Sequence, residues 1–227
     1  MSSSRPRRIV TLAAAAVLLG GCGGSVSDSG TAATVGDEAI SVAEVDNLAK
    51  ALCADSEDQL AEAGQEVPMT AVRQSALNIL VVTGAAQQIA DKYEVEPGAD
   101  YERARSAAQQ QAKLFDEEQQ DGFVVAASAD ALIQGVMTAT GEQLLIEEGV
   151  AKPTDEEAIQ RGSETFWSWP EVLDLDVNPV FDVEEVQGQL RPAAGADQVS
   201  FPVSATAQSA SDPEQVASGL PSHLRCG

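Results

Sequence analysis

Histidine, cysteine, aromatic side chains and basic side chains are all scarce in this 227-residue chain. It contains one histidine, three cysteines, 4% aromatic residues, and 13 lysines and arginines against 36 aspartates and glutamates. A Ser-His-Asp triad needs a histidine in a cleft that the fold defines, and the single histidine, His223, lies in the expected C-terminal tail. No cysteine and histidine spacing suits zinc, and no glycine-rich loop resembles a phosphate cradle. We therefore expect no metal, no cofactor and no enzyme. The number of carboxylates would allow a pair for glycoside hydrolysis, but such enzymes usually bind sugar rings with aromatic side chains, which are few here.

The shortage of basic residues also limits the partners. The formal net charge is −23, and phosphate groups are bound by clustered lysines and arginines, so we expect no nucleic-acid partner. The same charge opposes electrostatic contact with anionic lipid. We interpret the acidic residues as a solvated surface that keeps the protein soluble. A cation-binding role is the alternative, although no EF-hand loop is present.

The N-terminus carries an export pattern. Arg5, Arg7 and Arg8 precede an apolar run at 9–19, which is about half the ~20 residues needed to span a bilayer. A basic head, a short apolar body and small residues before a cut are typical of a secretory signal. A transmembrane anchor and an ordinary cleaved signal are the alternatives.

Positions 19–22 read Leu-Gly-Gly-Cys and resemble the lipobox of bacterial lipoproteins. In that family the cysteine thiol receives a diacylglyceryl group and becomes the new N-terminus. The resemblance implies a lipid on Cys22, a signal peptide at 1–21 and a polar glycine-serine tether at 22–32. It places the protein at the cell membrane, lipid-anchored on the extracytoplasmic face, with 10 basic and 36 acidic residues after cleavage. A disulfide is the alternative for this cysteine.

Two cysteines remain after the lipobox. Cys53 lies within the first expected helix, and Cys226 is the next-to-last residue. Thiols outside the cytoplasm tend to be oxidised and two is an even number, which predicts a Cys53–Cys226 disulfide. That bond closes a long loop and pins the C-terminal tail to the first helix. Two free thiols are the alternative.

The composition favours a helical core. Hydrophobic residues make up 44% of the chain while aromatics are rare, which is typical of packed helices rather than a large sheet. Ser41 with Glu44, and Thr154 with Glu157, form capping-box patterns that begin two helices. Residues 77–82 are apolar almost all round, which predicts a central helix covered on several sides. Up to Pro170 the pattern predicts five helices, over residues 41–64, 68–93, 100–121, 123–148 and 154–170, and a further short helix is expected at 213–218.

Three aromatic residues, Phe166, Trp167 and Trp169, stand just before Pro170. They form either a binding patch or a cluster that docks the last helix on the core, and we favour docking. Beyond Pro170 the chain reads as extended segments separated by glycine, proline, alanine and serine.

The segment 33–52 resembles the opening of the SurA/PrsA-type chaperones and foldases. Those proteins begin with a short strand, a tight turn, an apolar residue and a capped helix, and the matching residues here are Val35, Gly36, Asp37, Ile40, Ser41, Glu44 and Val45. Residues 73–80 look like the family's next helix. Residues 175–182 are similar to its closing strand, which pairs with the opening one.

The resemblance implies a mainly α fold. We expect a multi-helix SurA N-terminal-like domain at 33–185 with a small two-stranded β element, followed by an irregular, extended C-terminal tail at 186–227. The family usually adds a parvulin-type isomerase domain of about 100 residues with paired histidines. This chain has neither the free segment nor the histidines, so prolyl isomerase activity does not carry over.

The function that the resemblance implies is chaperone-like binding of unfolded or extended polypeptides. An apolar groove between helices would take side chains, and acidic rims would favour basic clients. The alternative is a structural or interaction lipoprotein that docks one folded envelope protein.

Overall fold

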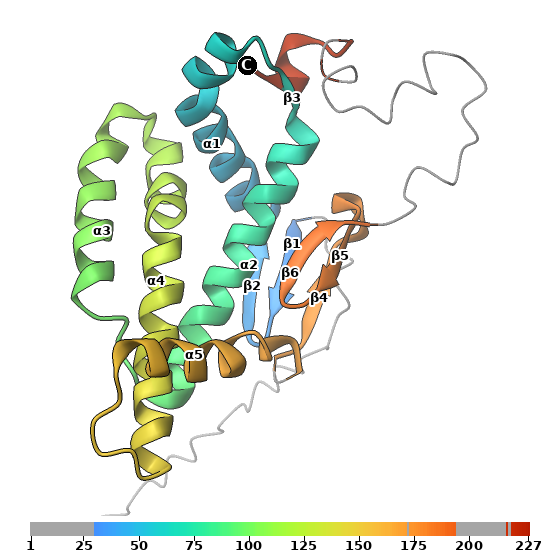
Figure 1. Ribbon diagram of the computed structural model, residues 1–227. Helices are drawn as coiled ribbons and strands as arrows, with labels where there is room; N and C mark the ends of the chain where they lie inside the picture. Colours follow the sequence, from blue (N-terminus) through green and yellow to red (C-terminus); the bar gives the residue numbers. More distant parts are fainter. Residues whose placement is uncertain (1–29, 172, 194–216, 218) are drawn as a thin grey trace, which may run out of the picture.

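A computed structural model describes residues 30–171, 173–193, 217 and 219–227 (Figure 1). The expected signal peptide, Cys22, most of the tether and most of the short helix expected at 213–218 lie outside the described residues. The described part is mainly helical, as predicted, with α-helices α1 (Val42–Ala63), α2 (Met69–Tyr93), α3 (Ala99–Gln111), α4 (Glu117–Glu147) and α5 (Asp155–Phe166).

Capping residues fix where α1 and α5 begin. The Ser41 hydroxyl accepts from the Glu44 amide at 3.1 Å, and the Glu44 carboxylate accepts from the Ser41 amide at 2.7 Å. Thr154 and Glu157 make the same pair of bonds at the start of α5. Both predicted capping boxes are confirmed. They stabilise the helix starts because the Ser or Thr and the Glu three residues later bond to amides that the first turn leaves free.

The expected third helix at 100–121 is wrong at both ends. It begins after Gly98 rather than at a cap on Asp100, and the φ of 86° at Gly98 suits glycine alone. It ends at Gln111, and a 3-10 turn, η1 (Ala112–Leu114), follows. Phe115 is extended and stacks on Phe123 with ring centroids 4.4 Å apart. The chain therefore reverses here, and residues 117–121 belong to α4, not to the helix before it.

Helix α4 is the centre of the bundle. It packs against α1, α2, α3 and α5, and Figure 1 shows α3 beside it and α5 crossing it. Glycines allow these close approaches: the backbone of Leu48 lies 3.0 Å from where a Cβ on Gly122 would stand. By length and composition α4 is the one helix of the described part that is apolar enough to cross a membrane.

Three short antiparallel sheets complete the fold. The strands β2 (Glu38–Ser41), β1 (Thr31–Val35) and β4 (Leu175–Val177) form one sheet in that order. The predicted pairing of the opening and closing strands is confirmed, with Ala33 opposite Val177. The sheet has a third strand, β2, and β4 ends at Val177, because Asn178 caps a 3-10 turn, η3 (Pro179–Phe181), instead of extending the strand.

A hairpin crosses the expected boundary at 185. Its strands are β5 (Val183–Val186) and β6 (Gln189–Pro192), joined at Gln187 and Gly188, which both have positive φ. Leu190 is buried in the core. The Gly188 carbonyl accepts from the Trp169 indole at 3.1 Å. The hairpin therefore belongs to the folded body, which continues past the expected boundary as far as Pro192.

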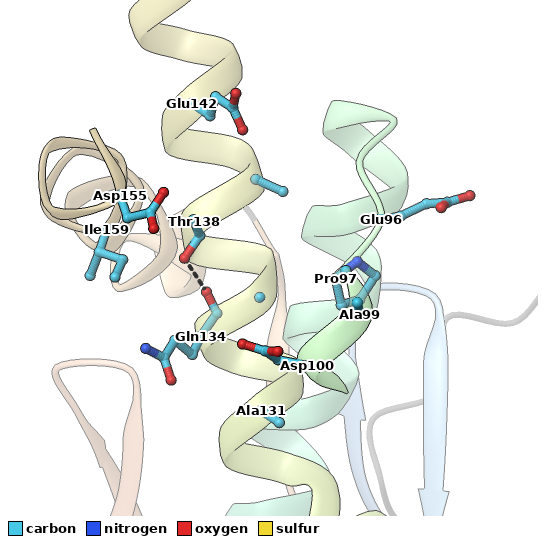
Figure 2. A pocket seen from close by; sticks show the side chains of 13 residues that line it. Glu96, Pro97, Ala99, Asp100, Ala131, Gln134, Thr138, Glu142, Asp155 and Ile159 are labelled. Carbon is cyan, nitrogen blue, oxygen red and sulfur yellow. Dashed lines mark hydrogen bonds between the residues drawn. The ribbon is translucent and has the colours of Figure 1, made fainter. Parts of the chain in front are cut away.

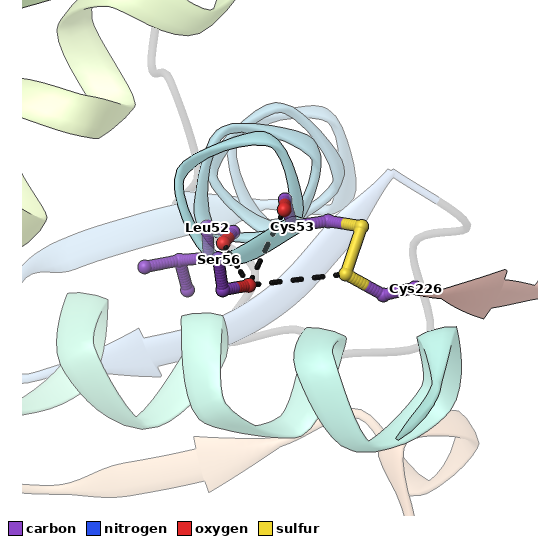
Figure 3. Close-up of a disulfide and its surroundings, with 4 residues drawn as sticks. All are labelled: Leu52, Cys53, Ser56 and Cys226. Carbon is purple, nitrogen blue, oxygen red and sulfur yellow. Dashed lines mark hydrogen bonds between the residues drawn. A yellow bond between two sulfur atoms is a disulfide. The ribbon is translucent and has the colours of Figure 1, made fainter. Parts of the chain in front are cut away.

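The last residues also return to the body. The strand β7 (Arg225–Cys226) pairs with β3 (Val67–Pro68). A disulfide joins Cys53 on α1 to Cys226, with 5.6 Å between the two Cα atoms across 173 residues of sequence (Figure 3). Ser56 lies beside the bond, its hydroxyl 3.9 Å from the Cys226 sulfur.

The main core lies where α2 faces the three-stranded sheet, α4 and the end of α5. Trp169, in the 3-10 turn η2 (Trp169–Glu171), and Phe166 are its two largest fully buried side chains. Two of the three aromatics therefore dock the end of α5 on the core, as favoured from the sequence. Trp167 is only half-buried and reaches the surface.

Candidate binding groove

A groove of about 440 Å³ lies between α2, α4, α5 and β6. Its apolar lining comes from three helical segments, with Ile79 and Val82 on α2, Ile133 and Met137 on α4, and Ile159 and Trp167 on or just after α5. All of these except Val82 are only half-buried, so their apolar surface remains open to a ligand.

Helical spacing explains why the apolar side chains gather. Ile133 and Met137 are four residues apart on α4 and so lie on the same face of the helix, one turn apart. Trp167 stands at one side, where Phe166 meets its ring edge-to-face at a centroid distance of 5.0 Å. That contact places a large, rigid apolar surface at the groove, the kind of side chain that dominates recognition sites.

The groove has a polar border on the side of the hairpin. The Asn78 side-chain oxygen accepts from the Leu190 amide at 2.7 Å and so holds β6 against α2. Gln189 and Asp130 also line the border. Polar groups beside an apolar floor are typical of ligand sites, because they fix the orientation of what binds.

An acidic cleft of about 460 Å³ adjoins the groove, between the loop after α2, α4 and the start of α5 (Figure 2). Its carboxylates come from four segments: Glu96 from the loop after α2, Asp100 from α3, Glu142 from α4 and Asp155 from α5. Gln134 and Ile159 line both the cleft and the groove. The two depressions therefore share one border and form a continuous surface.

The carboxylates of the cleft differ in their partners. Asp100 forms an exposed ion pair with Arg103 on the next turn of α3. Within the described residues, neither Glu142 nor Asp155 has an ion-pair partner. In the same part of the chain, no group of three or more histidine, cysteine, aspartate or glutamate side chains is placed to hold a metal ion.

Most of the residues singled out from the sequence lie elsewhere. Cys22 is outside the described residues. The Cys53–Cys226 disulfide joins the middle of α1 to β7, and Figure 1 shows the C-terminus, which follows β7, at the opposite end of the molecule from α5. His223 is exposed in a 3-10 turn, η6 (Ser222–Leu224). Among the groove residues, the sequence singles out only Trp167, as one of the three aromatics before Pro170. It does not single out the aliphatic ones, because a half-buried apolar residue and a core residue give the same sequence signal.

Comparison with known proteins gives no match. No family model fits the chain, and neither a curated protein sequence nor a solved structure shows significant similarity to it. Any functional conclusion therefore starts from the chain's own groove and cleft.

Proposed function

We propose that this protein is a lipid-anchored lipoprotein of the extracytoplasmic membrane face that binds unfolded or extended polypeptides, without prolyl isomerase activity. The observation that carries the proposal is the apolar groove between α2, α4, α5 and β6. Unfolded chains expose apolar side chains that folded proteins bury, and an open groove lined by Ile133, Ile159 and Trp167 offers those side chains a dry contact.

The magnitude of such binding suits transient capture. Burying apolar surface is worth about 25 cal/mol per Å², and a bound segment loses conformational freedom that offsets much of this gain. A groove that takes one or two side chains therefore holds a client weakly and releases it. The acidic surface, with 36 carboxylates in the chain, keeps the complex soluble.

The location in this proposal depends on Cys22. A lipid on that cysteine adds about 0.8 kcal/mol of membrane affinity per buried CH₂, which overcomes the repulsion between an acidic protein and anionic lipid. The test is incorporation of an alkyne-labelled fatty acid in the native cell. The parent chain should carry the label, Cys22→Ser should lose it, and Cys53→Ser should keep it. A label that survives Cys22→Ser removes the anchor from the proposal.

Binding is tested by suppression of aggregation. The full chain, held in neutral lipid nanodiscs, is mixed at several-fold molar excess with chemically denatured citrate synthase, and light scattering is followed with empty nanodiscs as the blank. We expect the parent chain to reduce scattering. Ile133→Gln, which places an amide in the groove, should weaken the effect, while Leu114→Gln, at a side chain that is 87% exposed, should not.

Two results would contradict the proposal. Undiminished scattering at all ratios would remove chaperone-like binding. Recovery of a single folded protein in a fixed stoichiometric complex, in place of a mixed set of clients, would instead favour the docking of one envelope partner.

A further inference from the structure

The apolar groove and the acidic cleft meet at Gln134 and Ile159, so one ligand can contact both. We infer that this joint surface selects polypeptide segments in which an apolar side chain is accompanied by a lysine or arginine two to five residues away. The inference rests on the proposed function and specifies its client. It commits to one occupant, an extended basic and apolar segment, because the groove suits its apolar side chain and the carboxylates of the adjoining cleft suit its cationic one.

Helix α4 presents two neighbouring rows of side chains to this surface. Ile133 and Met137 form an apolar row that faces the groove. Gln134, Thr138 and Glu142 form the adjacent row, spaced four residues apart, and line the cleft. Thr138 donates to the Gln134 carbonyl at 2.8 Å, so its hydroxyl is held by the helix itself (Figure 2). An extended ligand that crosses from one row to the next passes from apolar to anionic surroundings.

Helix α5 sets the spacing that the ligand must match. At 1.5 Å rise per residue, Asp155 lies about 6 Å along the helix from Ile159 and about 18 Å from Trp167. An extended peptide advances about 3.3 Å per residue. A cationic residue therefore reaches Asp155 about two residues after a side chain seated at Ile159, or about five residues after one seated at Trp167.

The charges of the cleft are available to such a cation. Glu142 and Asp155 are exposed and, among the residues that the structure describes, form no ion pair, whereas Asp100 already contacts Arg103. Two exposed pairs in high dielectric, each of the usual surface strength, together improve binding by about three- to tenfold. The gain is electrostatic, so it falls as salt rises and the Debye length shrinks from about 10 Å at 0.1 M to about 3 Å at 1 M.

The experiment compares three synthetic peptides of about ten residues with the same apolar core. The first carries two lysines two and five residues beyond a phenylalanine, the second has serines in their place, and the third has glutamates. Dissociation constants are measured by fluorescence anisotropy with the full chain in neutral nanodiscs, at low and at high salt. We expect the lysine peptide to bind about three- to tenfold more tightly than the serine peptide at 0.1 M salt, the glutamate peptide to bind most weakly, and the differences to disappear at 1 M.

Matched variants separate the cleft from the general acidity of the protein. Glu142→Gln with Asp155→Asn should abolish the preference for lysine and leave the serine peptide unaffected. Glu57→Gln with Asp58→Asn, on the exposed side of α1, changes the net charge equally and should keep the preference. Thermal melts of both double variants confirm that each is folded.

The outcomes distinguish this inference from the proposed function. Equal binding of the lysine and serine peptides overturns the inference and leaves the proposed function standing. Equal loss of the preference in both double variants also overturns it, because the whole acidic surface then accounts for the effect. If no peptide binds, the proposed function fails, and this inference fails with it.

Discussion

The pair Thr154 and Glu157 shows how single side chains determine where α5 begins. The Thr154 amide and hydroxyl both donate to the Glu157 carboxylate, at 2.9 and 2.8 Å. These bonds hold the pKa of Glu157 below its ordinary value of 4.5, and the bond from the Thr154 backbone has a larger effect than the bond from its side chain. The start of α5 matters for the proposed client, because Asp155 occupies its first turn and lines the acidic cleft.

The lowered pKa of Glu157 predicts how stability depends on pH. A carboxyl whose pKa is lower in the folded than in the unfolded state stabilises the fold above the unfolded value, and this contribution is lost as pH falls through the folded value. Glu157→Gln keeps an acceptor in the capping box but removes the charge. The parent should therefore be more stable than the variant at pH 7, and the difference should shrink as pH falls through and below 4.5.

Urea unfolding of the parent and Glu157→Gln at a series of pH values measures this difference. The control is Glu156→Gln, which removes a carboxylate from the same turn without touching the capping box. A difference between parent and Glu157→Gln that stays constant across the whole pH range would show that the charged form has no role in the cap.

Among the elements, the crossing of α4 and α5 is the closest contact. A Cβ added at Gly162 would collide with the Met137 carbonyl, and one at Gly141 would collide with the Ala158 carbonyl. Both obstacles are backbone atoms of helices, which cannot move aside as a flexible side chain can. The two glycines therefore set the distance between the helices that carry Met137 and Ile159 into the groove.

Gly162→Ala tests this crossing. Alanine in place of glycine inside a helix normally stabilises it by about 0.5–1 kcal/mol, so a loss of stability would be due to the collision alone. We expect a loss of about 1–3 kcal/mol in the free energy of unfolding, the usual cost of forcing extra volume into a packed contact. Thermal and urea denaturation measure it. Gly30→Ala, where the added Cβ meets nothing, is the control, and a Gly162→Ala protein as stable as the parent would mean that the helices separate freely.

The elements differ in how well the sequence predicts them. The starts of helices α1 and α5 are fixed by local signals, their capping boxes, and the bounds that the sequence predicts for both lie within a few residues of the observed ones. The sequence predicts the wrong boundary between α3 and α4, because the polar residues 117–121 continue a helical pattern across a turn at which Phe115 stacks on Phe123. The β5–β6 hairpin was missed because its positive φ at Gln187 and Gly188 carries a weak sequence signal, and its burial depends on distant contacts with Trp169 and Asn78.

The sequence predicts that a groove exists but not which residues line it. An apolar groove between helices with acidic rims follows from the resemblance and the charge, but which apolar residues stay open is decided by packing. Ile89 and Ile133 both lie within helical apolar patterns, yet Ile89 is buried and Ile133 lines the groove. Sequence periodicity identifies the apolar face of a helix and does not say whether a neighbouring element covers it.

At the scale of the whole molecule, contacts between distant segments close the described body at both ends. Strand β1 pairs with β4 about 140 residues later, and β7 pairs with β3. The β7 pairing is only two residues long, and its one ion pair, Arg225 with Glu66 at 3.0 Å, is partly exposed and worth at most about 1 kcal/mol. The Cys53–Cys226 bond is therefore the main constraint on the end of the chain.

Removing that disulfide should lower the free energy of unfolding by more than the loss of any other contact at the C-terminus would. A cross-link between residues 173 positions apart restricts the unfolded chain strongly, so Cys53→Ala with Cys226→Ala should lower the free energy of unfolding by about 3–5 kcal/mol. Amide hydrogen exchange should show β7 losing its protection first, while α5, at the far end, changes only as much as the global stability does. Reduction of the parent protein should reproduce the variant. A loss below about 1 kcal/mol with β7 still protected would mean that the strand pairing and the Arg225 ion pair hold the C-terminus unaided.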